Sequence, residues 1–238
     1  MEEFKNRTKS RKEFEVTNVK GDGSCLYRSM IRYLVDNQKK HNGNEYFYKI
    51  FYNTTLSEGK AAESLQYVLK DWIIEHQNDV LDSFMNIEGC IADLVCMSHE
   101  WIQNMDFYNY LYSIWAGNPN FIVEKTDKKD KRGRNIYKRI DIPSRWGGVP
   151  EIYAFYKIFG VRVNQWTVQR WDKKENKPKQ TVYDNTHGRY LLIQTIGLET
   201  DEHEMNLLYI DFKIVLRHYM YMKRKNIENT EEDEALEG

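Results

Sequence analysis

The residues best suited to chemistry lie in one short segment, Gly21-Asp22-Gly23-Ser24-Cys25-Leu26-Tyr27-Arg28. A thiol attacks only as its thiolate, and the pKa of a thiol, about 8.5 when free, falls at the N-terminus of a helix. We expect a glycine turn with a helix beginning at Cys25, so that the helix dipole stabilises a thiolate. Backbone N–H groups from Asp22, Gly23, Ser24 and Cys25 could then hold an oxyanion. A plain turn followed by a buried cysteine explains the same residues equally well.

Three blocks of sequence together resemble the OTU (ovarian tumour) family of cysteine proteases, which are deubiquitinases. Residues 21–28 resemble the family's Asp-Gly-x-Cys box, which opens a helix. Trp146-Gly147-Gly148, the following helix with Glu151, and residues 159–163 resemble its Trp-Gly-Gly segment, next helix and next strand. Residues 190–210 resemble its last two strands with a histidine between them. The blocks occur in the family's order, and the resemblance implies Cys25 as nucleophile of a thiol protease.

The resemblance also implies which histidine is the general base. A cysteine protease needs an imidazole to remove the thiol proton and later to protonate the leaving amine. His203 stands between the two strands of the third block and is the predicted base; His187 is the second choice. The sequence around His218 favours a C-terminal helix. The other histidines fall in or beside helical stretches and are predicted to be structural or exposed: His41, His76 and His99.

The residue that orients the imidazole departs from the family pattern. Relatives usually carry Asp or Asn two residues after the histidine, where this chain has Met205. Asn206 comes one residue later, and side chains three positions apart in a regular strand point to opposite faces. A β-bulge at residues 204–205 would restore a shared face, and we therefore predict Asn206 as the orienting residue. Glu204 and Asn18 are alternatives, and Asn18 resembles an arrangement that some relatives use.

The Trp146-Gly147-Gly148 segment is predicted to form the wall of a narrow substrate channel, because glycine lets another backbone approach closely. Ubiquitin ends in two glycines that fit such a channel, and Glu151 could meet arginines on its tail. A tight turn with a packing Trp and an ordinary charged helix face are the alternatives. The resemblance thus implies hydrolysis of the isopeptide bond at the terminal glycine of ubiquitin or polyubiquitin, through an acyl-enzyme on Cys25.

Three other functions remain open at this point. The first is a catalytically inactive OTU-like module that binds ubiquitin. The second is a cysteine protease that cleaves peptides without ubiquitin specificity. The third is a protease for a ubiquitin-like modifier.

The elements that must position these residues predict an α+β fold, with a small mixed sheet flanked by helices. Apolar residues recur at helical spacing after Cys25, while short alternating segments dominate the later half. We expect a charged extension at 1–14, a catalytic domain at 15–222 with a basic hairpin inserted at about 117–142, and an acidic, disordered tail at 223–238. The basic tip at 125–134 is either a solvated loop or an accessory contact for a partner.

Composition excludes several other classes of protein. The net charge of -1 gives no overall attraction to nucleic acid or to an anionic membrane. Three cysteines favour reduced thiols over a disulfide framework. No cofactor is predicted, because no phosphate-binding loop or dinucleotide motif occurs, and Cys90, Cys96 and His99 do not match a zinc spacing. We expect a cytoplasmic monomer. Its richness in Lys, Asn, Ile and Tyr hints at a virus or intracellular bacterium, and hence at action in a host cytoplasm.

Overall fold

A computed structural model describes residues 8–10, 13–21, 23–52, 57–98, 121–129, 133, 135–141, 147–172, 177–179, 189–212 and 216–225. Its helices are α2 (Cys25–Asp36), α3 (Gln38–His41), α4 (Glu45–Phe51), α5 (Glu58–Glu75), α6 (Ile91–Ser98) and α8 (Val149–Phe159), with a short 3-10 helix at Ser83–Met85. Its strands are β1 (Thr8–Ser10), β2 (Phe14–Thr17), β3 (Phe121–Lys129), β4 (Asn135–Asp141), β5 (Val161–Asp172), β6 (Lys177–Lys179), β7 (Arg189–Ile196), β8 (His203–Phe212) and β9 (Leu216–Arg224).

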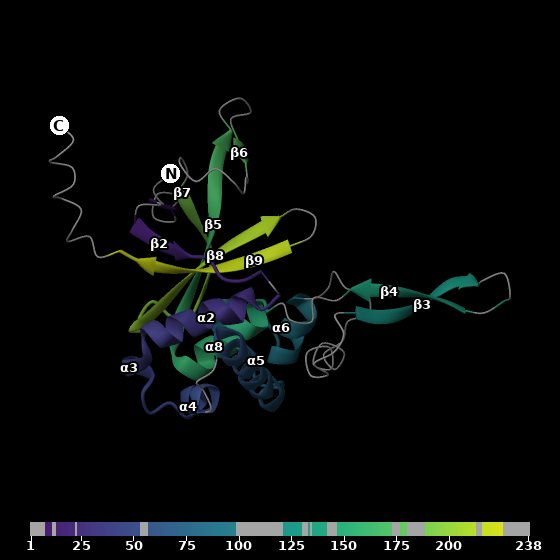
Figure 1. The fold of residues 1–238 in the computed structure, drawn as a ribbon, viewed down its shortest axis with the longest axis horizontal. Coiled ribbons are helices and arrows are strands. Elements are labelled where there is room, and N and C mark those ends of the chain that lie inside the picture. Colours follow the sequence, from purple (N-terminus) through teal and green to yellow (C-terminus); the bar gives the residue numbers. More distant parts are fainter. Residues whose placement is uncertain are drawn as a thin grey trace.

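Most of the described strands form one mixed sheet. Its order is β1-β7-β5-β8-β9-β2, with β6 paired to the end of β5. Strands β5 and β8 run parallel, and the other pairs are antiparallel. Figure 1 shows the helices gathered below the sheet, with α2 and α8 next to its strands. The predicted α+β class with a mixed sheet is confirmed.

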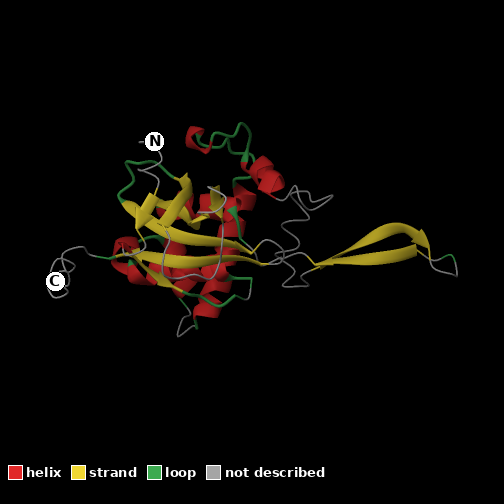
Figure 2. Cartoon of the chain, turned by 90° about the horizontal axis from the view of Figure 1, so that it is seen from above, coloured by secondary structure: helices red, strands yellow, loops and turns green. Residues whose placement is uncertain are grey.

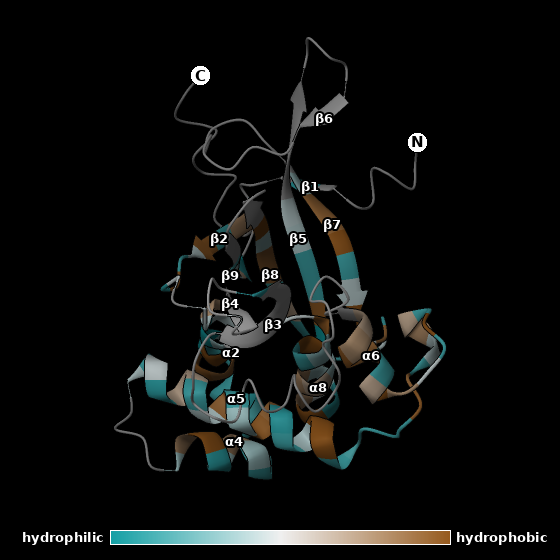
Figure 3. Ribbon diagram, turned by 90° about the vertical axis from the view of Figure 1, so that its right-hand side faces the viewer, coloured by the Kyte–Doolittle hydropathy of each residue, from teal (hydrophilic) through white to brown (hydrophobic). Residues whose placement is uncertain are grey.

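The two faces of the sheet bury two separate hydrophobic clusters. The larger lies between the sheet and the helices and includes Leu207 and Tyr221. The smaller lies on the other face and includes Leu208 and Met222. Neighbouring residues of one strand thus point to opposite faces, as the period of two requires. Hydrophobic residues, brown in Figure 3, gather on α8 and on strands of the sheet.

Local sequence explains where the helices begin and end. Asn44 caps α4, because its side-chain oxygen accepts the backbone N–H groups of Tyr46 and Phe47 at 2.9 and 3.1 Å. Pro150 occupies the first turn of α8, where its missing N–H costs nothing. Gly160 ends that helix in the left-handed conformation with φ 63°.

The structure corrects two local predictions and adds a detail to a third. Residues around His218 form strand β9, not a helix. Strand β8 pairs with β5 in unbroken register from His203 to Leu208, so it has no bulge at residues 204–205. Within the predicted N-terminal extension, Thr8–Ser10 adds a strand to the edge of the sheet. No described helix has both the length and the apolar character needed to cross a membrane.

The predicted basic hairpin is present as strands β3 and β4, paired antiparallel. The sequence of residues 128–134 is rich in Lys and Arg. Figures 1 and 2 show the hairpin projecting from the side of the molecule, apart from the large sheet and the helices. The acidic segment after Lys225 lies outside the described residues.

Candidate active site

Cys25 lies at the point predicted for a nucleophile, as the first residue of α2. It is 4% exposed. Its sulfur accepts a hydrogen bond of 3.4 Å from the backbone N–H of Tyr219 on β9. A helix N-terminus and a donated N–H both favour negative charge on sulfur over a neutral thiol. The last strand of the sheet therefore contributes directly to the surroundings of the thiol.

His218, the residue just before Tyr219, lies beside the turn that leads to Cys25. Its Nε2 lies 3.0 Å from the Oδ1 of Asn18. A Cβ added to Gly21 would lie 3.8 Å from both Nδ1 and Cε1 of His218, so this edge of the ring faces the turn. An N–H at Nε2 that donates to Asn18 leaves Nδ1 as the proton acceptor. Burial lowers the pKa of His218 below its ordinary value of 6.5, which keeps the ring neutral at pH 7.

Asn18 reaches His218 because of the pairing of two strands. It directly follows β2, whose Thr17 pairs with Tyr221 of β9. The antiparallel pairing carries the chain past the edge of β9, and from there through Gly21 to Cys25. Asn18 itself is exposed. Residues from both ends of the chain thus meet at one edge of the sheet.

His203, the predicted base, lies elsewhere. It begins β8, pairs with Val161, and its ring contacts the ring of His41 with a centroid distance of 5.8 Å. His41 ends α3, beyond the C-terminal end of α2. The 12 residues of α2 span about 18 Å, and Cys25 is at the other end. His203 therefore lies near the far end of α2, whereas His218 lies beside the turn that leads to Cys25.

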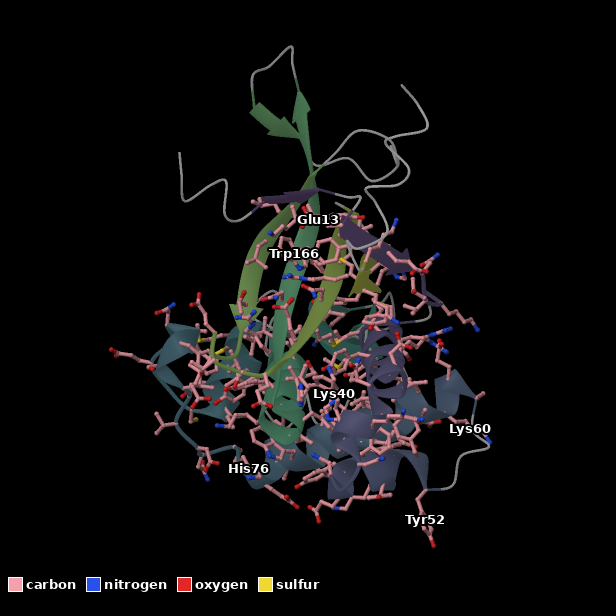
Figure 4. All side chains as sticks on the ribbon, turned by 90° about the vertical axis from the view of Figure 1, so that its left-hand side faces the viewer. Glu13, Lys40, Tyr52, Lys60, His76 and Trp166 are labelled. Atoms are coloured by element: carbon pink, nitrogen blue, oxygen red, sulfur yellow. The ribbon has the colours of Figure 1, made fainter. Side chains whose placement is uncertain are left out.

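Asn206, the predicted orienting residue, lies in a buried polar network on the other face of the sheet. Its Oδ1 accepts from Trp166 Nε1 at 2.8 Å and from Asn164 Nδ2 at 3.4 Å. Its Nδ2 donates to Glu204 at 3.0 Å. Trp166 belongs to the smaller cluster, and Figure 4 places it in the sheet away from the helices. Without the bulge, Asn206 lies on the same face as Leu208, and its side chain is engaged by Trp166, Asn164 and Glu204.

Glu204 is held in the same network and does not approach His218. Its carboxylate forms ion pairs with Arg162 and, at 3.1 Å, with Arg224. Although burial works in the opposite direction, the hydrogen bonds from Arg162 and Asn206 and the two positive charges lower the pKa of Glu204. The carboxylate is therefore committed to structural partners.

Gly147 of the Trp-Gly-Gly block lies against the start of α2. A Cβ on Gly147 would lie 2.5 Å from Leu26 Cδ2 and 3.1 Å from Tyr27 Oη, so any larger residue would have to displace these buried side chains. Gly148 is the N-cap of α8, and its N–H donates to the Glu151 carboxyl at 2.6 Å. Glu151 is 2% exposed. This burial corrects the prediction that Glu151 meets arginines of a bound tail.

The predicted site residues Asp22 and Trp146 and the alternative base His187 lie outside the described part of the chain, as does His99. Gly23 is described and has φ 83°, a conformation that favours glycine. Ser24 precedes Cys25 as the N-cap of α2. In the described ranges, no three His, Cys, Asp or Glu side chains are grouped to hold a metal ion.

A signal for His218 was present in the sequence. Residues 219–222 are Tyr-Met-Tyr-Met, a continuous run of large apolar residues. Such a run is typical of a strand that is buried on both faces. A strand at residues 219–222 would run beside β8 and pass close to Cys25. Asn18 is one of the predicted alternatives for the orienting residue, but its partner in the structure is His218 and not His203.

Comparison with solved structures finds OTU domains, although no family model and no curated protein matches the chain. The Hazara virus OTU domain bound to ubiquitin has 13% identity and a TM-score of 0.43, covering 92% of this chain and 87% of its own. The Farallon virus OTU protease has 16% identity and a TM-score of 0.40, covering 90% and 85%. The OTU deubiquitinase of Wolbachia pipientis bound to ubiquitin has 14% identity and a TM-score of 0.35, covering 90% and 97%. The chain resembles the OTU domains, the family to which its three sequence blocks pointed.

Proposed function

We propose that this protein is a thiol-dependent hydrolase in which Cys25 is the nucleophile, His218 the general base and Asn18 the residue that orients the imidazole. The observation that carries the proposal is the convergence of the Cys25 sulfur, the Tyr219 N–H and the His218–Asn18 pair at the N-terminus of α2. A nucleophile, a base and a group that orients the base are the parts that acyl transfer by a cysteine requires.

In the proposed reaction, His218 Nδ1 takes the proton of Cys25, and the thiolate attacks the carbonyl carbon of the scissile bond. The carbonyl oxygen becomes an oxyanion, which backbone N–H groups near Gly23 to Cys25 stabilise. His218 then protonates the leaving amine, and water hydrolyses the thioester with His218 as base. Asn18 holds the ring with Nδ1 toward the thiol throughout.

The substrate we propose is ubiquitin or polyubiquitin, with the scissile bond at its C-terminal glycine. Support comes from the first two sequence blocks and from Gly147, whose backbone packs on the two residues that follow Cys25. A backbone without side chains at this place leaves room for a narrow glycine tail. The segment around Cys25, the Gly147–Gly148 backbone and strand β9 with His218 thus suit a deubiquitinase better than a protease with a wide peptide cleft.

The test is reaction with ubiquitin that carries a C-terminal electrophile, followed by intact mass. We expect the wild type to form a covalent adduct, Cys25→Ala to form none, and His218→Ala to react at least about a hundredfold more slowly. His203→Ala is the matched control and should react at the wild-type rate. A slow His203→Ala with a fast His218→Ala would reverse the assignment of the base.

The same experiment separates the other functions. A folded wild type that binds ubiquitin without forming an adduct would establish the inactive binding module. Cleavage of short peptides in place of ubiquitin substrates would establish a general peptidase. Faster reaction with a ubiquitin-like modifier carrying the same electrophile would change the substrate and leave the mechanism intact.

A further inference from the structure

The proposed reaction leaves one buried acidic side chain unused, that of Glu151. Its Oε2 accepts the Gly148 N–H at 2.6 Å. Its Oε1 is buried and has no hydrogen-bond partner among the described atoms. Burial raises the pKa of Glu151 to about 7, although the hydrogen bonds act in the opposite direction. Carboxyl groups are rarely buried unless they are paired, so this one calls for a physical reason.

Helix capping alone does not supply that reason. Glu at the third position of a helix commonly accepts the N–H of the N-cap residue, and it does so from the protein surface. Capping therefore gains nothing from removing the carboxyl group from water, which carries a free-energy cost. The cost is offset only if the buried position itself is useful.

The segment that Glu151 holds is the one that touches the nucleophile helix. The backbone of Gly147 packs on Leu26 and Tyr27, the two residues after Cys25. Tyr27 is 1% exposed, and burial followed by the nearby Glu151 and Cys25 raises its pKa well above the usual value. An unbroken chain of contacts thus runs from Glu151 through Gly148 and Gly147 to the first turn of α2.

We propose that Glu151 is a positioning residue: by holding the Gly148 N–H it fixes the Gly147–Gly148 backbone on Leu26 and Tyr27, and so sets the wall of the substrate channel beside Cys25. The inference rests on the proposed function, because it assigns a role in the binding of that substrate. The role proposed for Glu151 is to place the substrate tail, and it does not involve the intrinsic reactivity of the Cys25 thiol.

Two variants of Glu151 test the hydrogen bond. Glu151→Gln keeps an oxygen that can accept the Gly148 N–H, and Glu151→Leu has similar volume without an acceptor. For hydrolysis of a ubiquitin C-terminal amide of a fluorophore, we expect kcat/KM to fall about 10-fold to 100-fold in Glu151→Leu. Glu151→Gln should stay within about threefold of the wild type. Alkylation of Cys25 by iodoacetamide should change by less than about threefold in both, because so small a reagent does not need the channel.

Gly147→Ala is the second variant, in case Glu151→Leu does not fold. Its Cβ would press on Leu26 and Tyr27 and displace the same wall while Glu151 stays in place, so the same loss of ubiquitin turnover is expected. Glu45→Leu, in the exposed first turn of α4, is the matched control and should change neither reaction.

Hydrogen exchange at the Gly148 amide separates this inference from the proposed function. The amide should be protected in the wild type and in Glu151→Gln, and should exchange at least about tenfold faster in Glu151→Leu. Equal exchange, or an active wild type with full activity in Glu151→Leu, overturns the inference alone. A wild type that is alkylated at Cys25 but leaves every ubiquitin substrate intact overturns the proposed function, and with it the catalytic role of Glu151, even if the amide remains protected.

Discussion

The imidazole Nε2 of His218 lies 3.0 Å from the Oδ1 of Asn18, a residue 200 positions earlier in the chain. The contact fixes one ring nitrogen as the donor and leaves the other for a proton transfer. The contact also links Asn18, which leads into the turn before Cys25, to strand β9.

Removing the side-chain oxygen of Asn18 should slow the reaction without unfolding the protein. In Asn18→Ala we expect kcat/KM on a ubiquitin substrate to fall about 10-fold to 100-fold, because the ring is no longer held in one orientation. Asn18→Asp, which keeps an acceptor oxygen, should recover most of the rate. Asn42→Ala, at another exposed position, serves as control. Full turnover in Asn18→Ala would remove Asn18 from the mechanism.

Asn206→Ala should give the opposite result, a loss of stability without a loss of reactivity. The substitution leaves the buried N–H of Trp166 without an acceptor. We expect the free energy of unfolding in urea to drop by about 1–3 kcal/mol. The rate of adduct formation with electrophilic ubiquitin should match that of the wild type. A slower adduct at unchanged stability would return Asn206 to the active site.

His41 should make the protein sensitive to acid. Burial, followed by the nearby His203 and Lys40, lowers its pKa from 6.5 to about 4. The unfolded chain therefore binds a proton at a higher pH than the folded one, so this stability is present above about pH 6.5 and is lost as the pH falls through about 4. His41→Phe, among Tyr33, Phe47 and Phe159, should remove about 1–2 kcal/mol of this acid dependence. Urea unfolding from pH 7 to pH 4 measures it, and parallel curves would refute it.

Glu151 should contribute a pH dependence of the opposite sign. Its pKa is raised from 4.5 to about 7 in the folded protein. The folded state then retains a proton that the unfolded chain has lost, so stability falls as the pH rises from about 4.5 through about 7. Glu151→Gln cannot titrate, and its stability relative to the wild type should grow by about 1–3 kcal/mol between pH 5 and pH 8. Thermal unfolding at the two pH values would show it, and an unchanged difference would contradict it.

The basic hairpin should act as an accessory contact and not as part of the folded core. Deleting residues 126–134 removes the Lys- and Arg-rich tip. We expect alkylation of Cys25 to be unaffected and KM for ubiquitin substrates to rise, with an effect that weakens at high salt because the contact is between charges. Unchanged KM at low salt would reject this role.

Much of the site was predictable because its signals are local. Cys25 at a helix start, the glycine turn before it and the glycine pair at 147–148 each follow from a few adjacent residues whose conformational preferences are strong. Helical spacing after Cys25 and after Pro150 likewise predicted α2 and α8. These are properties that short stretches of chain carry by themselves.

Only the tertiary structure placed the pair of His218 and Asn18 beside the turn that leads to Cys25. His203 and His218 are both histidines in strand-rich sequence, and their difference lies in the register of β8 with β5 and of β9 with β2. One residue of bulge would have turned Asn206 to the other face, and β8 has none. Strand register depends on contacts between distant segments, so the sequence by itself determined the helix that begins at Cys25, while the pairing of β2 with β9 brought Asn18 and His218 together.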